Sequence, residues 1–177
     1  HQYQKNIKRK LIHDFFSKKN PNILVTMPTG SGKTVLAMET IVDLFRSFES
    51  YNNANIHIMW LVNSKELCEQ SFQSFQKIWK QKGDHEVIAE RYFSKFQNLL
   101  QTTKSKITFA SLDLMVARLD REEVEKQFEN TTLLIIDETH GINASEYNRV
   151  LLRYKELNLN YRIMGLTATP FRNDDDD

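Results

Sequence analysis

The sequence predicts an α/β protein, a three-layer sandwich in which helices cover both faces of a mainly parallel β-sheet. Short, unbroken apolar runs such as residues 133–136 alternate with longer segments whose apolar residues recur at helical spacing. Strands buried on both faces read as continuous apolar runs, and helices supply the crossovers that parallel strands need. The runs at 23–27 and 133–136 lead into residues suited to ligand binding, and ligands of such sheets gather at the carboxyl ends of strands.

The N-terminal half is predicted to alternate between helix and strand. Apolar residues recur at helical spacing through the first 18 residues, and Pro21 with its flanking asparagines ends that helix. An apolar strand at 23–27 leads through a glycine turn into a helix that reaches about residue 48. After a polar loop at 50–55 come a strand at 56–62 and a helix at 64–80, for which Ser64 is a candidate N-cap.

The C-terminal half continues the alternation with shorter elements. Residues 87–101 fit a strand or a helix equally well, and the choice stays open. A short strand at 107–110 precedes helical patterns at 112–119 and 122–128. The remaining elements are the strand at 133–136, a helix at 145–157 and a last strand at 162–166.

Composition bounds the class of protein. The chain has 177 residues, 40% of them hydrophobic, which is enough for one domain with its own core. The formal net charge of +1 gives no overall basic field, so nucleic-acid binding must come from local arrangement. No stretch approaches the about 20 apolar residues of a membrane span, and we expect no membrane partner. The single cysteine, Cys68, suits a reducing compartment, so we expect a cytoplasmic protein in which it is a small apolar helix residue.

Residues 27–34, Met-Pro-Thr-Gly-Ser-Gly-Lys-Thr, have the composition of a phosphate-binding loop. Gly30 and Gly32 let main-chain N–H groups approach a polyphosphate, at which the following helix points its positive end. Lys33 can reach the β- and γ-phosphates, and the Thr34 hydroxyl can ligate Mg²⁺. The general pattern begins with glycine where this chain has methionine, but the Gly-Ser-Gly-Lys-Thr core is intact. The alternative is a glycine turn with a chance lysine.

Asp137 and Glu138 follow the buried strand at 133–136. An acidic residue at the tip of such a strand, paired with a Lys-Thr phosphate loop, is where an ATPase holds Mg²⁺. Asp137 would hold the ion, and Glu138 would orient and deprotonate the attacking water. Without the phosphate loop, the same pair would read as an ordinary solvated turn. His140 adds a third metal-ligating side chain, but the chain has no His-Glu-x-x-His and no cysteine pair, which disfavours zinc.

The whole chain resembles the first lobe of superfamily 2 DExH helicases, in the branch that contains restriction-enzyme motor subunits. The resemblance rests on segments in the order of the helicase motifs, at residues 3–4 (the adenine-reading Tyr-Gln), 28–34 (motif I), 59–67 (motif Ia), 107–111 (a strand and loop that touch the nucleic-acid backbone), 137–140 (motif II) and 165–172 (motif III). It implies a RecA-like fold, ATP and Mg²⁺ as cofactors, and an ATP-driven helicase or translocase acting on DNA, with RNA as the alternative.

The resemblance also implies roles for individual residues. ATP would be bound by Gln4, at the adenine edge, and by Thr29, Gly30, Ser31, Gly32, Lys33 and Thr34. The catalytic residues would be Lys33, Asp137 and Glu138, and the Mg²⁺ ligands Thr34 and Asp137. Nucleotide state would be coupled to the nucleic-acid site by His140, Thr167 and Thr169, although a simple strand-end turn is an alternative for the two threonines. Nucleic acid would be contacted by Asn63, Ser64, Lys65 and Ser111; the family more often has Pro-Thr at 63–64.

Helicases of this superfamily close two similar lobes around ATP, and the second lobe supplies arginine fingers. Residues 1–173 correspond to the first lobe and the acidic residues 174–177 to a tail or the start of a linker. We therefore expect a second RecA-like lobe as partner and weak ATP hydrolysis by this lobe alone. The alternatives are a self-contained P-loop switch or small kinase, disfavoured by the lack of an Asn-Lys-x-Asp element, and a binding module without catalysis, which no missing catalytic residue favours.

Overall fold

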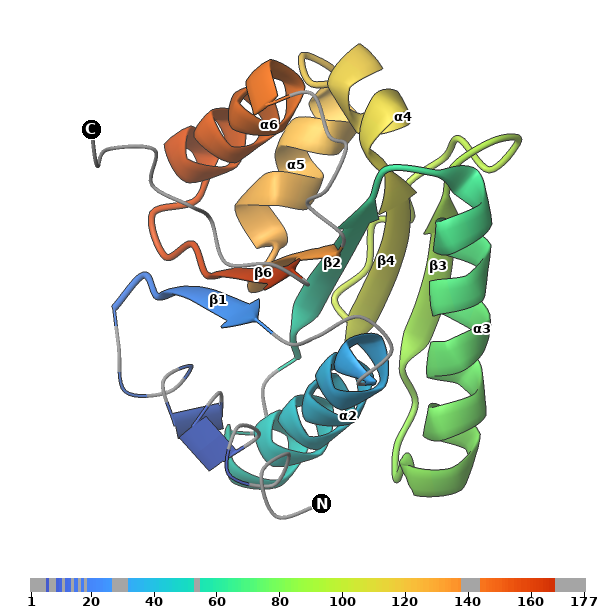
Figure 1. Ribbon diagram of the computed structural model, residues 1–177, viewed down its shortest axis with the longest axis vertical. Coiled ribbons are helices and arrows are strands. Elements are labelled where there is room, and N and C mark those ends of the chain that lie inside the picture. The colour runs from blue at the N-terminus through green and yellow to red at the C-terminus, as the bar shows by residue number, and fades with distance from the viewer. Residues whose placement is uncertain are drawn as a thin grey trace, which may run out of the picture.

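A single six-stranded sheet forms the centre of the molecule (Figure 1). The computed structural model describes residues 6, 9, 10, 12, 13, 15, 17, 19–26, 32–52, 55–137 and 144–167. The strands run in the spatial order β1-β6-β5-β2-β4-β3, and every neighbouring pair is parallel. Their bounds are β1 Asn22–Thr26, β2 His57–Val62, β3 Ile88–Tyr92, β4 Lys106–Ser111, β5 Leu133–Asp137 and β6 Ile163–Thr167. The predicted α/β class with a mainly parallel sheet is confirmed.

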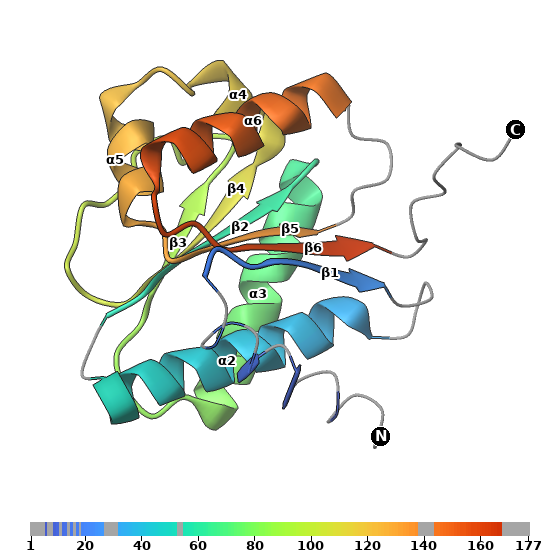
Figure 2. The same cartoon turned by 90° about the vertical axis from the view of Figure 1, so that its left-hand side faces the viewer.

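Helices cover both faces of the sheet, which gives the predicted three layers (Figure 2). One face carries α2 (Lys33–Asn52) and α3 (Lys65–Lys82), and the other carries α4 (Leu112–Ala117), α5 (Glu122–Asn130) and α6 (Ala144–Leu157). The described residues between 6 and 17 are helical, as expected, and Phe15 is buried in the same apolar cluster as α2. None of the described helices combines the length and apolar character needed to cross a bilayer.

The core consists of two apolar clusters, one on each side of the sheet. On the α3 side, Cys68, Phe72 and Phe75 recur at helical spacing and are buried. The rings of Phe72 and Phe75 lie 5.7 and 5.9 Å from the ring of Phe109 in β4, so the helix is fixed directly on the sheet. Burial raises the pKa of the Cys68 thiol to about 12, which keeps it protonated and unreactive at neutral pH.

The register brings the carboxyl ends of the strands to one edge of the sheet. Thr26 of β1 is aligned with Thr167 of β6, and Asp137 of β5 with Leu166 of β6. Further along the same edge, Val62 of β2 is aligned with Ser111 of β4. The strand order therefore separates this edge into a β1-β6-β5 part, which carries the nucleotide candidates, and a β2-β4-β3 part, which carries the nucleic-acid candidates.

In two segments the structure changes or completes the sequence-based expectation by more than a shift of one or two residues at the end of an element. The helix α2, which follows the predicted phosphate loop, continues to Asn52, so the predicted loop at 50–55 begins too early, because polar residues are tolerated at the end of a helix. The open segment 87–101 contains β3 followed by an irregular stretch, and none of its residues is helical. β3 is the edge strand beside β4, and most of its side chains are half-buried, which explains the missing apolar run.

The irregular stretch between β3 and β4 is fixed by a buried polar network around Lys106. Its ammonium group donates to the carbonyl of Leu100 at 2.6 Å and to Gln127 Oε1 at 2.7 Å, and it lies 3.2 Å from Glu90 Oε2. Burial lowers the pKa of Lys106, and the nearby Glu90 carboxylate opposes that shift. The network joins β3, β4 and α5 and anchors the chain at Leu100.

Candidate functional site

The first part of the site is the junction between β1 and α2. Gly32 has φ 82°, in the left-handed region that favours glycine, and its carbonyl accepts the first described bond of α2 from Leu36 N at 2.8 Å. Lys33 is the first residue of the helix and Thr34 the second. The predicted ATP-binding residues Gln4, Thr29, Gly30 and Ser31 lie outside the described residues.

α2 presents an anion-binding end to this edge of the sheet. The helix has 20 residues, so its first turn carries the partial positive charge of a helix N-terminus. No acidic residue occupies that turn, and therefore no side chain competes with an incoming phosphate. Together with the left-handed Gly32, the helix start has the features of a cradle for a polyphosphate.

Thr34 and Asp137 come together although they are 103 residues apart in sequence. The Thr34 hydroxyl donates to Asp137 Oδ2 at 3.0 Å, and Asp137 is buried at 4% exposure at the carboxyl end of β5. A hydroxyl and a carboxylate at this separation are hard oxygen ligands of the kind that Mg²⁺ takes in combination with substrate phosphates. The residues that are present therefore fit a Mg²⁺–nucleotide complex.

Thr167 ends the strand that lies between β1, which leads toward the start of α2, and β5, which ends at Asp137. It ends β6 and is buried at 1% exposure, with β1 on one side and β5 on the other. The structure thus brings Thr167 beside the strand ends at Thr26 and Asp137. His140 and Thr169, predicted to couple nucleotide state to the nucleic-acid site together with Thr167, lie outside the described residues, as does Glu138, predicted to activate the attacking water.

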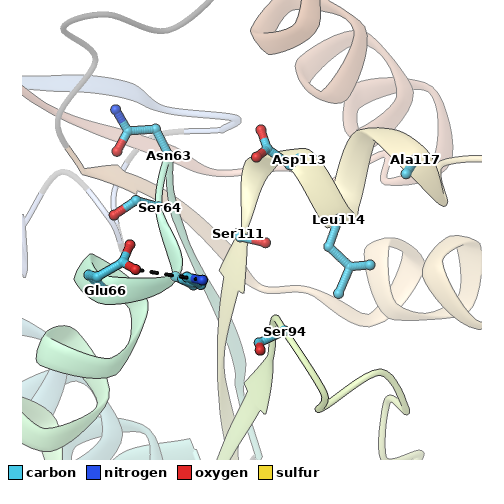
Figure 3. Close-up of a pocket in the computed structure, with 9 residues that line it drawn as sticks. Asn63, Ser64, Glu66, Ser94, Ser111, Asp113, Leu114 and Ala117 are labelled. Atoms are coloured by element: carbon cyan, nitrogen blue, oxygen red, sulfur yellow. Dashed lines mark ion pairs between the residues drawn. The ribbon is translucent and has the colours of Figure 1, made fainter.

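The second part of the site is a groove of about 570 Å³ at the carboxyl ends of β2 and β4 (Figure 3). All four residues predicted to contact nucleic acid line this groove, namely Asn63, Ser64, Lys65 and Ser111. One side of the groove is the start of α3, and the opposite side is α4. The structure therefore collects side chains from two segments of the chain into one surface.

Ser64 has the N-cap role that its sequence position allowed. Its hydroxyl accepts from Leu67 N at 3.2 Å, and its carbonyl accepts from Cys68 N at 3.0 Å. Ser111 occupies the matching position before α4, but its side chain makes no capping bond. It is 7% exposed and has no hydrogen-bond partner among the described residues, although it lines the groove. A hydroxyl that lines a groove and makes no hydrogen bond within the described part of the protein is available to a ligand.

Sequence reasoning missed the other residues of the groove, which are Glu66, Ser94, Asp113, Leu114 and Ala117. Those on α4 lie within the first six positions after Ser111, but the sequence alone does not show which of them line a groove. Ser94 had no signal in the sequence, because it comes from the segment left open between strand and helix. Its φ of 56° is left-handed, which is uncommon for a residue other than glycine.

Two arginines hold the segment that carries Ser94. The Arg91 guanidinium donates twice to the Glu69 carboxylate, at 2.8 Å each, and stacks 3.6 Å above the Phe72 ring. Hydrogen bonding to Arg91 lowers the pKa of Glu69. Arg118, at the end of α4, donates to the carbonyl of Gln97 at 2.8 Å. The third side of the groove is thereby tied to both α3 and α4.

Comparison with known proteins agrees with this geometry. Residues 1–172 match the family described as "Type III restriction enzyme, res subunit". The ATP-dependent DNA helicase Hel308 of Methanococcus vannielii is 28% identical over 171 residues, which cover 91% of this chain and 21% of that helicase. The chain therefore spans about a fifth of the length of this relative.

Solved structures share the fold at lower identity. The Hef helicase domain of Pyrococcus furiosus is 21% identical, with a TM-score of 0.64 over 97% of this chain and 33% of that one. A nuclease-deletion mutant of the Type ISP restriction-modification enzyme LlaGI, in complex with a DNA substrate mimic, is 17% identical, with a TM-score of 0.67 over 99% of this chain and 18% of that one. These likenesses confirm the predicted RecA-like fold.

Proposed function

Since this chain belongs to the Type III restriction enzyme res-subunit family, we propose that it is the ATP-binding motor lobe of a DNA-dependent helicase or translocase. The observation that carries the proposal is the 3.0 Å contact between Thr34 and Asp137 at the start of α2. This contact lies on the same edge of the sheet as the groove between α3 and α4. A nucleotide site and a strand-binding groove side by side are what a motor lobe requires.

In this proposal the nucleotide is held by backbone and side chains together. The loop at 29–32 and the positive end of α2 bind the triphosphate, Lys33 contacts its β- and γ-phosphates, and Gln4 reads the adenine edge. Thr34 and Asp137 hold Mg²⁺, which when bound neutralises charge on the phosphates. Glu138 orients the attacking water and accepts its proton. Together these groups provide the positioning and charge neutralisation on which phosphoryl transfer depends.

The groove contacts the sugar–phosphate backbone of one strand. Asn63, Ser64, Lys65 and Ser111 supply amide, hydroxyl and ammonium donors, and the N-terminus of α3 adds its partial positive charge. Contacts of this kind position a strand without reading its sequence, as a motor that moves along DNA requires. His140, Thr167 and Thr169 couple the nucleotide to the groove; Thr167 supports this role because it lies between β1 and β5.

The rest of the motor lies outside this chain. The chain covers 21% of Hel308 and 33% of the Hef helicase domain, which supports a second RecA-like lobe elsewhere in the same protein. That lobe would complete the ATP site with arginine side chains, so the isolated first lobe should bind ATP and hydrolyse it slowly. The name of Hel308 and the DNA mimic bound to LlaGI support DNA as the substrate, with RNA as the alternative.

The proposal is tested by Mg²⁺-dependent ATP hydrolysis in the full-length protein. We expect strong stimulation by single-stranded or duplex DNA and little by RNA. Glu138→Gln should retain ATP binding and lose turnover, whereas Glu129→Gln, an exposed carboxylate on α5, should behave as wild type. Stimulation by RNA alone would move the protein to the RNA helicases. Hydrolysis that no nucleic acid stimulates would favour a self-contained nucleotide switch.

A further inference from the structure

The groove proposed to bind a polyanion carries a net negative charge. Its lining has one basic residue, Lys65, and two acidic residues, Glu66 and Asp113, which sum to 1 − 2 = −1. With Lys65 outnumbered by the two acids, attraction for phosphate depends also on the start of α3 and on neutral donors such as Ser111. The first turn of α2, at the nucleotide site, has no such acid. The two anion sites on this edge of the sheet thus differ in charge.

Glu66 weakens the attractive side of the groove in two ways. It lies in the first turn of α3, where its charge opposes the positive end of the 18-residue helix as seen by a phosphate. Its Oε1 is also 3.9 Å from the ammonium group of Lys65 (Figure 3). Both side chains are about two-thirds exposed, 67% and 64%, so the pair is solvated and neither charge is cancelled by burial.

Asp113 supplies a second negative charge from the opposite side of the groove. It lies in the first turn of α4, facing the start of α3 across the groove (Figure 3). The side chain is exposed and has no ion-pair or hydrogen-bond partner among the described residues. A strand seated on Ser111 would therefore pass between two carboxylates.

We propose that Glu66 and Asp113 weaken the hold of the groove on the strand, so that each phosphate is released quickly after a step. This inference rests on the proposed function, because it concerns the same groove. A protein that moves along a polymer must let go as often as it binds, and like charges on both sides of the backbone provide that release. A carboxylate about 6 Å from a phosphate in water weakens binding about three-fold.

The test uses the full-length protein and a fluorescein-labelled 20-nucleotide oligo(dT), with affinity from anisotropy and dissociation from stopped flow. Glu66→Gln and Asp113→Asn should each raise affinity about three-fold, and the double variant about ten-fold, with slower dissociation. Asp120→Asn is the matched control, since this exposed carboxylate has no ion-pair partner among the described residues and does not line the groove. Lys65→Gln should lower affinity.

The outcomes separate this inference from the function on which it rests. Unchanged affinity and dissociation in the double variant, with wild-type binding intact, would overturn the inference and leave the motor assignment standing. An equal gain in Asp120→Asn would also overturn it, since the effect would then follow net charge. Wild-type protein that binds no strand, with ATPase that no nucleic acid stimulates, would overturn the proposed function and the inference with it. Thermal unfolding shows that each variant is folded.

Discussion

Thr34 and Thr40 lie on the same helix, yet their hydroxyls have different partners. The Thr34 hydroxyl donates across the molecule to Asp137, at 3.0 Å, whereas the Thr40 hydroxyl donates to the carbonyl of Leu36 in its own helix, at 2.8 Å. The first bond is available for exchange with a metal–nucleotide ligand, and the second is enclosed in the core. The same substitution at the two positions therefore distinguishes the loss of a proposed metal ligand from a change in core packing.

We expect Thr34→Val to lower nucleic-acid-stimulated ATPase activity by on the order of 10²-fold, because the oxygen proposed to ligate Mg²⁺ is lost. Thr34→Ser should retain most activity, since it keeps the hydroxyl. Thr40→Val should remain active with a small change in the free energy of unfolding. Steady-state ATPase assays over a range of Mg²⁺ concentrations check this. Full activity in Thr34→Val would remove Thr34 from the metal site.

At the level of residues, the sequence identified groups whose chemistry depends on local spacing. Lys33 and Thr34 follow a glycine turn, and Asp137 ends an apolar run, so both could be read directly from the sequence. Glu66 and Asp113 could not, because an acidic residue in the first turn of a helix is ordinary. Only the pairing of β2 with β4, which brings the starts of α3 and α4 to the same edge of the sheet, places these two carboxylates on opposite sides of one groove.

Among the elements, α3 links stability to binding through its N-cap. Ser64→Ala should lower the free energy of unfolding by about 1 kcal/mol, because Leu67 N loses its partner. Ser64→Asp should keep the cap and the stability, since aspartate is a good N-cap, but it should weaken DNA binding by adding a third carboxylate to the groove. Urea unfolding and oligonucleotide anisotropy measure the two effects separately.

The stability measurement and the binding measurement on the Ser64 variants can each contradict its own part of the prediction. Unchanged stability in Ser64→Ala would show that the cap contributes little to α3. Wild-type affinity in Ser64→Asp would place the phosphate backbone away from the start of α3. Ser71→Ala, at a buried position on the same helix, is a control for the loss of a hydroxyl outside the groove.

Elements with a continuous apolar run were the most predictable. β2 and β5 are buried along nearly their whole length, and their runs were visible as strands. β3 was not visible as a strand, because the charged residues Glu90 and Arg91 interrupt its apolar run. Their side chains form hydrogen bonds with neighbouring elements instead. Only the contacts of Arg91 with Glu69 and Phe72 show why a polar segment stays at the sheet edge.

In the molecule as a whole, the Lys106 network is a buried polar feature that sequence reasoning did not foresee. Lys106→Met should lower the free energy of unfolding by about 3 kcal/mol, because Glu90, whose side chain is 10% exposed, would be left without its cation. Adding Glu90→Gln should recover part of that loss. Chemical denaturation of the single and double variants measures this; equal stability of Lys106→Met and wild type would show that the network is dispensable.

Lys106 also makes the free energy of unfolding depend on pH, and the direction of that dependence follows from its lowered pKa. Burial lowers the pKa of Lys106 below its ordinary 10.5, so the folded state releases this proton before the unfolded state does. The unfolded state then binds more protons, and stability rises with pH between the folded pKa and 10.5. The difference in unfolding free energy between wild type and Lys106→Met should grow over that range, measured by urea titrations at several pH values. A constant difference would contradict the lowered pKa.

The overall class was predictable, but the spatial order of the strands was not. Alternating apolar runs and amphipathic helices indicate a parallel sheet, and its carboxyl edge as the ligand edge, without stating which strands are neighbours. The order β1-β6-β5-β2-β4-β3 decides that Thr167 lies beside Asp137 and that Ser111 lies beside Val62. These adjacencies depend on long-range packing, which short-range periodicity does not encode.

The pairing of β1 with β6 also sets the time at which this lobe becomes competent during synthesis. Among the six described strands, β1 leaves the ribosome first and β6, its neighbour in the sheet, leaves last. The middle strands β2, β4 and β5 can associate earlier, whereas the strand that leads into the phosphate loop must wait for residues 163–167. A nascent chain that stops before β6 would hold much of its core, but β1 would lack its neighbour in the sheet, so the proposed nucleotide site would be completed only after residues 163–167 have been made.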